Sequence, residues 1–116
     1  MRTTTTRPAA MAGLFYPGDA DQLRAELHEA LAAAHPAPAP VAPKLLVVPH
    51  AGYVYSGPIA ASAYALLRPW AGRIRRVVLL GPAHRVAPRG LAAPSVEAFE
   101  TPLGRCLLYT SPSPRD

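Results

Sequence analysis

The chain of 116 residues has the length of one domain. Half of it is apolar and 16% is charged, which is typical of a globular protein and excludes a disordered one. The net charge of +5 comes mainly from scattered arginines, a pattern that does not favour nucleic-acid binding. No apolar run reaches membrane-spanning length and the N-terminus lacks a signal-peptide core, so we expect a cytoplasmic protein with no membrane contact.

The first predicted element is a helix that follows the turn signal "GLFYPGD" at residues 13–19. Asp19 suits the N-cap, and Gln22 three residues later completes a pair that resembles a capping box. The leucines of the next turns recur at four-residue spacing and form one apolar stripe: Leu23, Leu27 and Leu31. The dipeptide His35-Pro36 should end this helix.

Two apolar runs, residues 44–48 and residues 75–80, indicate strands on either side of a second predicted helix. That helix should begin near Pro58, which suits a first helical turn, and end at Arg68-Pro69. Strands that are apolar on both faces are expected in parallel sheets covered by helices. The order strand, helix, strand predicts a right-handed βαβ unit and hence an α/β fold with a parallel-rich sheet and flanking helices.

The C-terminal part gives weaker signals. We expect a short strand or hairpin near residues 90–93 and a turn at residues 102–104. The last eleven residues, "CLLYTSPSPRD", can be encoded by one reading frame of a widely used transposase sequencing adapter. We therefore expect residues 106–116 to be an adapter-derived tail, although a natural Pro/Ser-rich tail is the alternative. Residues 1–105 would then be the N-terminal part of a larger single domain, inactive alone and with apolar strand edges exposed.

Two histidines follow the two predicted strands. His50 lies in "PHAGYVYSG" after the first strand, and His84 lies in "GPAH" after the second. Because the carboxyl ends of parallel strands meet at one edge of a sheet, both imidazoles could face one pocket. Such a pair could bind iron, zinc or copper, or one imidazole could act as a general base. The sequence therefore predicts catalytic and metal-binding roles for His50 and His84.

The residues between His50 and the second helix could shape that pocket. Gly52 and Gly57 would allow tight turns and a close approach of the backbone, and Tyr53 could offer a hydroxyl or a stacking face. A helix that begins near Pro58 would aim free N–H groups at the same edge, which favours an anionic ligand. The glycines form neither a Gly-x-Gly-x-x-Gly nor a Walker A motif, which excludes a nucleotide-binding loop.

Structural roles compete with each of these assignments. A single loop histidine is more often solvated or hydrogen-bonded than functional, and only the matched position of the second one favours a site. His28 and His35 are most simply surface or capping residues. Tyrosines near a helix more often pack than bind substrate. The single cysteine, Cys106, permits neither an internal disulfide nor a cysteine-based zinc site.

The blocks "VVPHAGYVYSGPIAASAYALL", "VVLLGPAHRV" and "FETPLG" closely resemble the Memo-like family, also called AmmeMemoRadiSam system protein B. The resemblance runs from Arg7 to Gly104 and implies a fold similar to that of the class III extradiol dioxygenases, which are non-haem iron enzymes. It also implies a histidine-rich cleft that binds Fe or Cu, to which His50 and His84 correspond. Arg85 stands where the family often has another histidine. A further family histidine and cysteine lie beyond this chain, and Cys106 is not that cysteine.

The resemblance leaves two functions open. The intact protein could be a metal-dependent oxidoreductase of the dioxygenase type. Alternatively, it could be a non-catalytic binding protein whose cleft captures an anionic ligand or a partner peptide. The family name implies association with a radical-SAM protein and an AMMECR1-like protein, and a small molecule or a peptide is the expected ligand. The resemblance does not identify the substrate.

Overall fold

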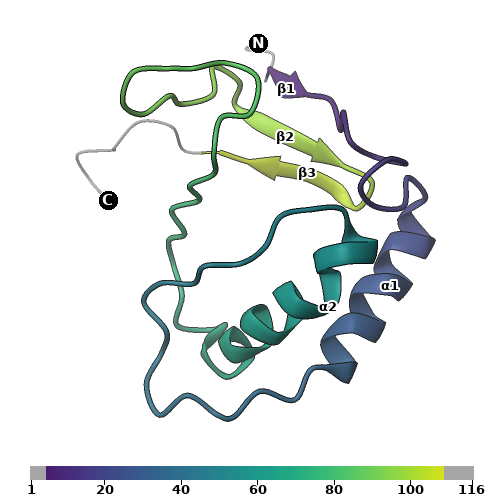
Figure 1. The fold of residues 1–116 in the computed structure, drawn as a ribbon, viewed down its shortest axis with the longest axis vertical. Helices are drawn as coiled ribbons and strands as arrows, with labels where there is room; N and C mark the ends of the chain where they lie inside the picture. Colours follow the sequence, from purple (N-terminus) through teal and green to yellow (C-terminus); the bar gives the residue numbers. More distant parts are fainter. Residues whose placement is uncertain (1–4, 109–116) are drawn as a thin grey trace. The chain divides into compact units, whose positions relative to one another are not determined.

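The computed structural model of the chain describes residues 5–108 (Figure 1). It divides into two compact units, and each is described by itself. One unit, Met11–Arg76, contains the helices; the other, Met1–Ala10 with Val77–Asp116, contains the strands. Within residues 5–108, no helix combines the length and the apolar character needed to cross a membrane.

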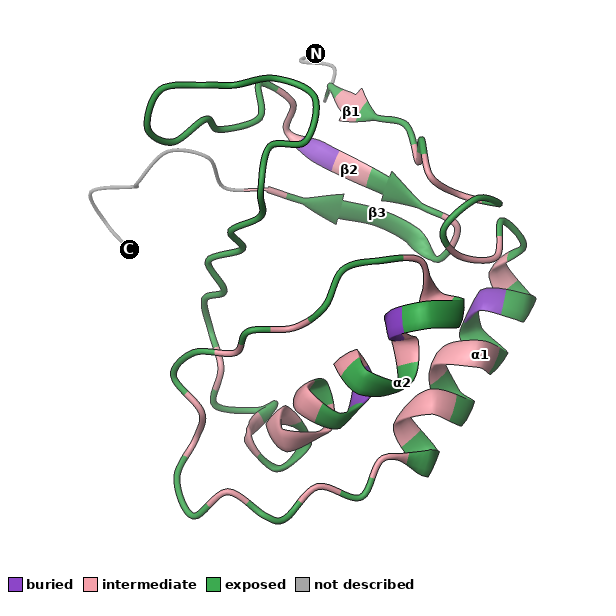
Figure 2. Ribbon diagram, in the orientation of Figure 1, coloured by how far each residue is buried: buried purple, intermediate pink, exposed green. Residues whose placement is uncertain are grey.

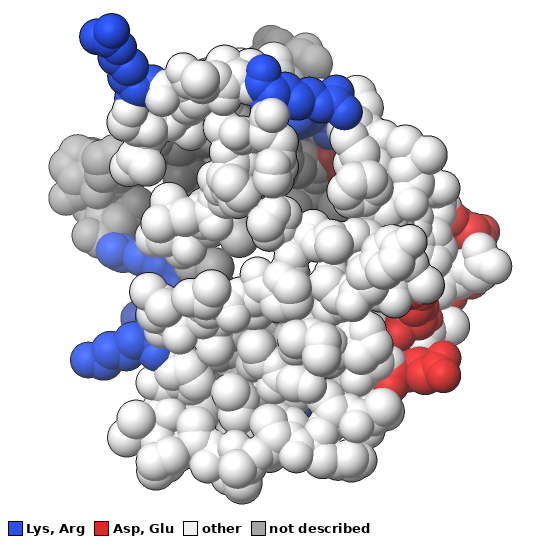
Figure 3. Space-filling model, viewed as in Figure 1, with Lys and Arg blue, Asp and Glu red and all other residues white. Residues whose placement is uncertain are grey.

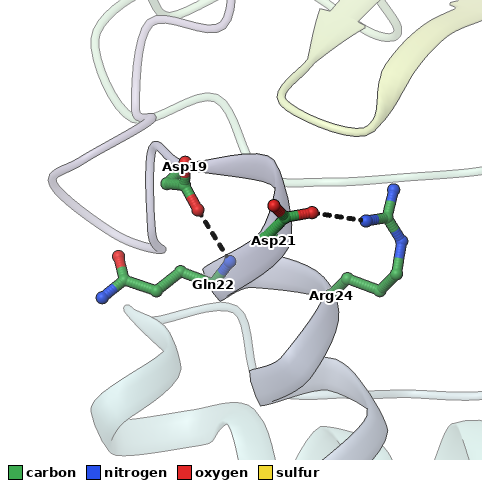
Figure 4. A network of polar contacts seen from close by, with 4 residues as sticks. All are labelled: Asp19, Asp21, Gln22 and Arg24. Atoms are coloured by element: carbon green, nitrogen blue, oxygen red, sulfur yellow. Dashed lines mark hydrogen bonds and ion pairs between the residues drawn. The ribbon is translucent and has the colours of Figure 1, made fainter.

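Helix α1 spans Ala20–Ala33 and begins where the sequence predicts. The Asp19 carboxylate accepts a hydrogen bond from the backbone N–H of Gln22 at 2.9 Å, as Figure 4 shows. This bond satisfies one of the backbone donors that the first helical turn leaves open. The helix ends with Ala34 as C-cap, directly before the His35-Pro36 pair that was expected to stop it. The prediction of this element is confirmed at both ends.

Helix α2 spans Tyr53–Tyr64 and begins earlier than predicted. Gly52 is its N-cap, and the backbone N–H of Tyr53 donates to the carbonyl oxygen of Phe15 at 2.8 Å. Pro58 therefore lies inside the helix, where it cannot donate a backbone bond to the preceding turn. The prediction of a helix start at Pro58 is wrong because the partner that fixes the first turn comes from a distant loop.

A 3-10 helix, η1, continues α2 over Ala65–Trp70. It runs through Pro69, so the predicted stop at Arg68-Pro69 comes slightly too early. The backbone N–H of Ala71 donates to the carbonyl of Arg68 at 3.3 Å and closes this segment. The tighter 3-10 geometry is common where an α-helix ends.

Helices α1 and α2 pack against each other and hold the buried residues of their unit (Figure 2). Leu23 of α1 is 3% exposed, and α2 buries Ser56 and Ala61. The Ser56 hydroxyl donates to the carbonyl of Ala51 at 2.7 Å, which satisfies this buried polar group. The larger apolar side chain of Ile59 in α2 is exposed. Small side chains thus make the buried part of α2.

Neither of the two predicted apolar strands forms. Residues 44–48 and 75–80 are irregular, and no backbone hydrogen bond in the described part of the chain joins either run to a neighbour. Leu45 is 78% exposed and Val78 is 84% exposed. An extended segment needs an adjacent strand to satisfy its backbone groups, and none is paired with these runs within residues 5–108. The βαβ unit is therefore not seen. The apolar side chains of both runs are exposed, but the strands whose edges were expected to be exposed do not form.

The sheet of the second unit has the order β1-β2-β3 and is made from Thr6–Arg7, Ala98–Thr101 and Gly104–Leu107. Strand β1 runs parallel to β2, and β2 runs antiparallel to β3. Ala98 in β2 is fully buried. The helices and this sheet confirm a mixed α/β chain, but the sheet is built from other segments than those predicted.

A two-residue turn connects β2 to β3 and confirms the turn expected at residues 102–104. The Thr101 hydroxyl accepts from the Leu103 N–H at 3.1 Å and donates to the Gly104 carbonyl at 2.9 Å. Gly104 has a φ of +135°, a conformation that favours glycine. The strand expected near residues 90–93 is absent, since this stretch is irregular in the structure.

Strand β3 includes the start of the predicted adapter-derived tail. Cys106 pairs with Phe99 and Leu107 pairs with Ala98 across the ladder. Backbone pairing of this kind needs no particular side chain, so it is compatible with either origin of the tail. Residues 109–116 lie outside the described residues, and the assignment of residues 106–116 stays a prediction.

Candidate functional site

The two histidines of the predicted pair lie in different units. His50 is exposed and lies two residues before the N-cap of α2, in the unit Met11–Arg76. His84 is exposed on the irregular stretch that follows Val77, in the other unit. Each is therefore placed within its own unit only, and their convergence on one pocket stays a prediction.

The described residues do not assemble a metal site by themselves. Within residues 5–108, no group of three or more His, Cys, Asp or Glu side chains is placed to hold a metal ion. His28 and His35 are exposed, in agreement with their expected surface positions. The donor set found here thus does not fit a metal ion without further ligands, because protein sites for zinc or iron generally use three or more protein side chains.

A groove of about 540 Å³ lies beside the first turn of α2. It is formed within one unit, by the loop at residues 13–17, the N-terminal half of α1 and the start of α2. Aromatic and small residues dominate its lining: Gly13, Leu14, Phe15, Tyr16, Pro17, Glu26, Ala51, Gly52, Tyr53, Val54 and Tyr55. Two of the three predicted pocket residues, Gly52 and Tyr53, line this groove, whereas Gly57 does not.

Backbone bonds fix the loop that forms one wall of the groove. The Gly13 N–H donates to the Tyr16 carbonyl at 2.8 Å, and the Phe15 N–H donates to the Met11 carbonyl at 2.9 Å. Gly13 has a φ of +81°, a left-handed conformation that most side chains avoid. The carbonyl of Phe15 then accepts the Tyr53 N–H, so the loop and α2 are held together. The "GLFYPG" and "AGYVY" stretches therefore form one local structure.

The glycines act differently from what the sequence predicted. Gly52 has a φ of −54° and Gly57 lies inside α2, so neither provides a left-handed turn. A methyl group added at Gly52 would lie 3.5 Å from the Phe15 carbonyl oxygen, which is ordinary contact. At Gly57 it would lie 3.6 Å from Cβ of Tyr53. Gly52 does lie beside the loop, but the contact leaves room for a Cβ atom and does not require a glycine.

The structure alters the ionisation of Tyr53, which lines the groove. Burial raises the pKa of its hydroxyl above the ordinary value of 10.0. The neighbouring Tyr16 and the negative charge of Glu26 raise this pKa further, as does Tyr64. The rings of Tyr16 and Tyr53 lie with centroids 5.6 Å apart and planes tilted by 41°, a usual geometry for packed aromatics.

Glu26 is a groove residue that the sequence reasoning missed. It lies three residues after Leu23, within the half-buried stripe of α1 that also contains Leu27. A carboxylate at a position of the apolar stripe is the signal that could have identified it.

The start of α2 offers little to an anion. The backbone N–H of Tyr53 donates to Phe15, while the N–H groups of Tyr55 and Ser56 donate to the carbonyl of Gly52 at 2.9 and 3.0 Å. Glu26 adds a negative charge to the groove lining. The expectation of an anionic ligand rested on free N–H groups near Pro58, and the helix does not begin there.

The sequence comparisons identify the family of the chain. Residues 7–110 match the family described as Memo-like protein, and this range contains both histidines and the whole groove. The chain belongs to the Memo-like family. It is 39% identical to protein MEMO1 of Xenopus tropicalis over 97 residues, which are 84% of this chain and 31% of that protein.

Two prokaryotic relatives show a similar identity over a similar share of the chain. The chain is 39% identical over 99 residues to a MEMO1 family protein of Aquifex aeolicus, covering 84% of the chain and 34% of the relative. It is 40% identical over 106 residues to a MEMO1 family protein of Ignicoccus hospitalis, covering 84% and 37%. This Memo-like chain thus spans about a third of the length of the curated relatives it matches.

Proposed function

We propose that this chain supplies two imidazole ligands, His50 and His84, to a redox-metal site in a Memo-like protein of family length. The observation that supports the proposal is the family match, which spans both histidines. Neutral imidazole suits iron and copper, and Fe or Cu is the metal that the family resemblance implies. The remaining ligands would come from the part of the family length that this chain does not span.

The reaction class belongs to the same proposal. A metal-dependent oxidoreductase of the dioxygenase type is the activity we propose for the family-length protein, with His50 and His84 as the candidate catalytic residues. A non-catalytic binding protein is the alternative, but its anionic ligand was inferred from a helix start at Pro58, and α2 begins at Tyr53. We therefore prefer the metal-dependent form.

The test uses a chimera of family length. The segment of the Aquifex aeolicus relative that matches this chain is replaced by the corresponding residues of the chain, and Fe(II) or Cu(II) binding is measured by equilibrium dialysis and elemental analysis. We expect stoichiometric metal binding that His50→Ala and His84→Ala each weaken by at least about tenfold. His28→Ala, on an exposed face of α1, is the matched control and should bind metal normally.

Unchanged metal binding in both histidine variants would contradict the proposal. Oxygen uptake with catecholic compounds then separates an oxidoreductase from a binding protein, since only the former consumes oxygen with turnover. The association with a radical-SAM protein and an AMMECR1-like protein is a separate proposal, and co-purification of the chimera with each protein tests it.

A further inference from the structure

The groove beside α2 combines several aromatic rings with one formal charge. Phe15 and Tyr16 come from the loop, and Tyr53 and Tyr55 come from the first turn of α2. Glu26 of α1 is the single charged residue among those that line the groove. The Tyr16 and Tyr53 rings are held in contact, and the Tyr53 backbone is tied to the loop at Phe15. The loop and the first turn of α2 are thus held together, while the Phe15 and Tyr55 side chains are exposed at the groove.

The carboxylate of Glu26 has no basic partner in the part of the chain that the structure describes. The ion pair on α1 joins Arg24 to Asp21 at 3.1 Å instead, and both of these side chains are largely solvent-exposed. The acidic side chains visible in Figure 3 gather mostly over α1, the helix that carries Asp21, Glu26 and Glu29. No lysine or arginine lines the groove. Its electrostatic character is thus negative.

The aromatic rings and the Glu26 carboxylate together favour a positively charged ligand. The face of an aromatic ring carries partial negative charge, which attracts a cation placed above it. A half-buried carboxylate loses part of its hydration, and a cation nearby offsets that loss. An anion would meet repulsion from both Glu26 and the ring faces. A neutral apolar ligand would bury ring surface but leave the carboxylate without a partner.

We propose that the groove formed by Phe15, Tyr16, Tyr53, Tyr55 and Glu26 binds a small organic ammonium ion. The methyl or methylene groups of such an ion would contact the ring faces, while its positive charge lies near the Glu26 carboxylate. A volume of about 540 Å³ accommodates a ligand of this size. The proposal requires no metal and does not depend on the convergence of His50 and His84.

The test compares choline with its neutral isostere 3,3-dimethylbutan-1-ol, using the 116-residue chain labelled with nitrogen-15 in buffer that contains EDTA. We expect choline to cause saturable shifts of the amide signals of Gly13 and Gly52, with a dissociation constant on the order of millimolar. The signal of Gly72, which does not line the groove, should not move. The neutral isostere should bind at least about fivefold more weakly, because it lacks the charge.

Two variants test whether the Glu26 carboxylate and the Phe15 ring contribute to choline binding. Glu26→Gln should weaken choline binding by about threefold to fivefold, whereas Glu29→Gln, on the exposed face of the same helix, should not. Phe15→Leu should weaken it by a similar factor, because a ring face is lost while the backbone carbonyl that holds α2 remains. The amide signal of Tyr53 in the same spectra shows that the loop still contacts α2.

Three outcomes would overturn the proposal. The first is the absence of saturable shifts at Gly13 and Gly52. The second is equal binding of choline and the neutral isostere, which would make the groove merely apolar. The third is unchanged binding in both Glu26→Gln and Phe15→Leu. Because EDTA removes free metal ions, none of these results depends on whether the metal proposal holds.

Discussion

The helical pair and the two apolar runs have opposite structural outcomes, although the runs are the more apolar of the two regions. Helices α1 and α2 form regular structure and bury Leu23 to 3% exposure. The runs at residues 44–48 and 75–80 remain irregular, with Leu45 78% exposed. The sequence assigns both regions to regular elements, yet the region with charged residues such as Arg24 and Glu26 is the one that forms them. Hydrophobicity alone therefore does not explain the difference.

The difference lies in where each element finds its hydrogen-bond partners. A helix satisfies its backbone groups within one continuous stretch, and α1 adds its own cap through Asp19. A strand satisfies them only across a ladder with another strand. The sheet that does form uses β1, β2 and β3, whose partners are present in the chain. Apolar strands without neighbours stay exposed, and this contrast can be tested directly.

The largest expected effect is in amide hydrogen exchange. Amides in the middle of α1 should be protected nearly to the free energy of global unfolding, because their bonds lie inside a packed helix. Amides at residues 45–48 and 77–80 should exchange close to the unprotected rate, since no backbone bond in residues 5–108 involves them. Exchange followed by NMR measures both. Equal protection in the two regions would contradict the comparison.

Truncation of a buried leucine and of an exposed leucine should give the next largest difference, in the free energy of unfolding. Leu23→Ala should lower the free energy of unfolding by about 2–4 kcal/mol, because it removes a buried side chain between helices. Leu45→Ala should change it by less than about 0.5 kcal/mol, because that side chain is already exposed. Urea unfolding monitored by circular dichroism measures both. A loss at Leu45 as large as that at Leu23 would show that the apolar run is packed in solution.

The N-cap of α1 gives a smaller effect. Asp19→Ala should lower the free energy of unfolding by about 1 kcal/mol, because it removes the bond to the Gln22 N–H. Asp19→Asn should recover most of the loss, since an amide oxygen can also cap. The control is Asp21→Ala, which removes the exposed ion pair to Arg24 and a carboxylate of the first helical turn and should cost a few tenths of a kcal/mol. A larger loss at Asp21 would refute the capping role.

The smallest effect is the pH dependence that Tyr53 adds. Its pKa is raised in the folded state, so the folded chain holds the hydroxyl proton more tightly than the unfolded chain does. The stability contribution is complete below the unfolded pKa of about 10 and is lost as pH rises through the folded pKa. Unfolding measured between pH 8 and about pH 11 should show this fall, and Tyr53→Phe should reduce it. An identical pH profile for Tyr53→Phe would show that Tyr53 does not cause the fall in stability.

The candidate site was only partly predictable. The sequence assigned Gly52 and Tyr53 to a pocket shared with His50 and His84, which stays a prediction; in the structure both residues line the groove, which neither histidine lines. It did not identify Glu26, because a charged residue within an apolar stripe is easily counted as surface. Gly57, which it assigned to the same pocket, lies inside α2 and does not line the groove. The pairing of the histidines needs contacts between the two units, and sequence spacing cannot supply such contacts.

The sequence by itself determined the family, the span and cap of α1, and the turn between β2 and β3. The helix cap and the turn depend on residues close together in the chain, such as the pair Asp19 and Gln22, and the family on blocks of sequence that need no structure to be recognised. Only the tertiary structure decided that α2 begins at Tyr53, because the carbonyl that fixes its first turn belongs to Phe15 in a distant loop. It likewise decided which segments became strands. A strand requires a partner across a ladder, and local sequence encodes the preference for extension but not the presence of that partner.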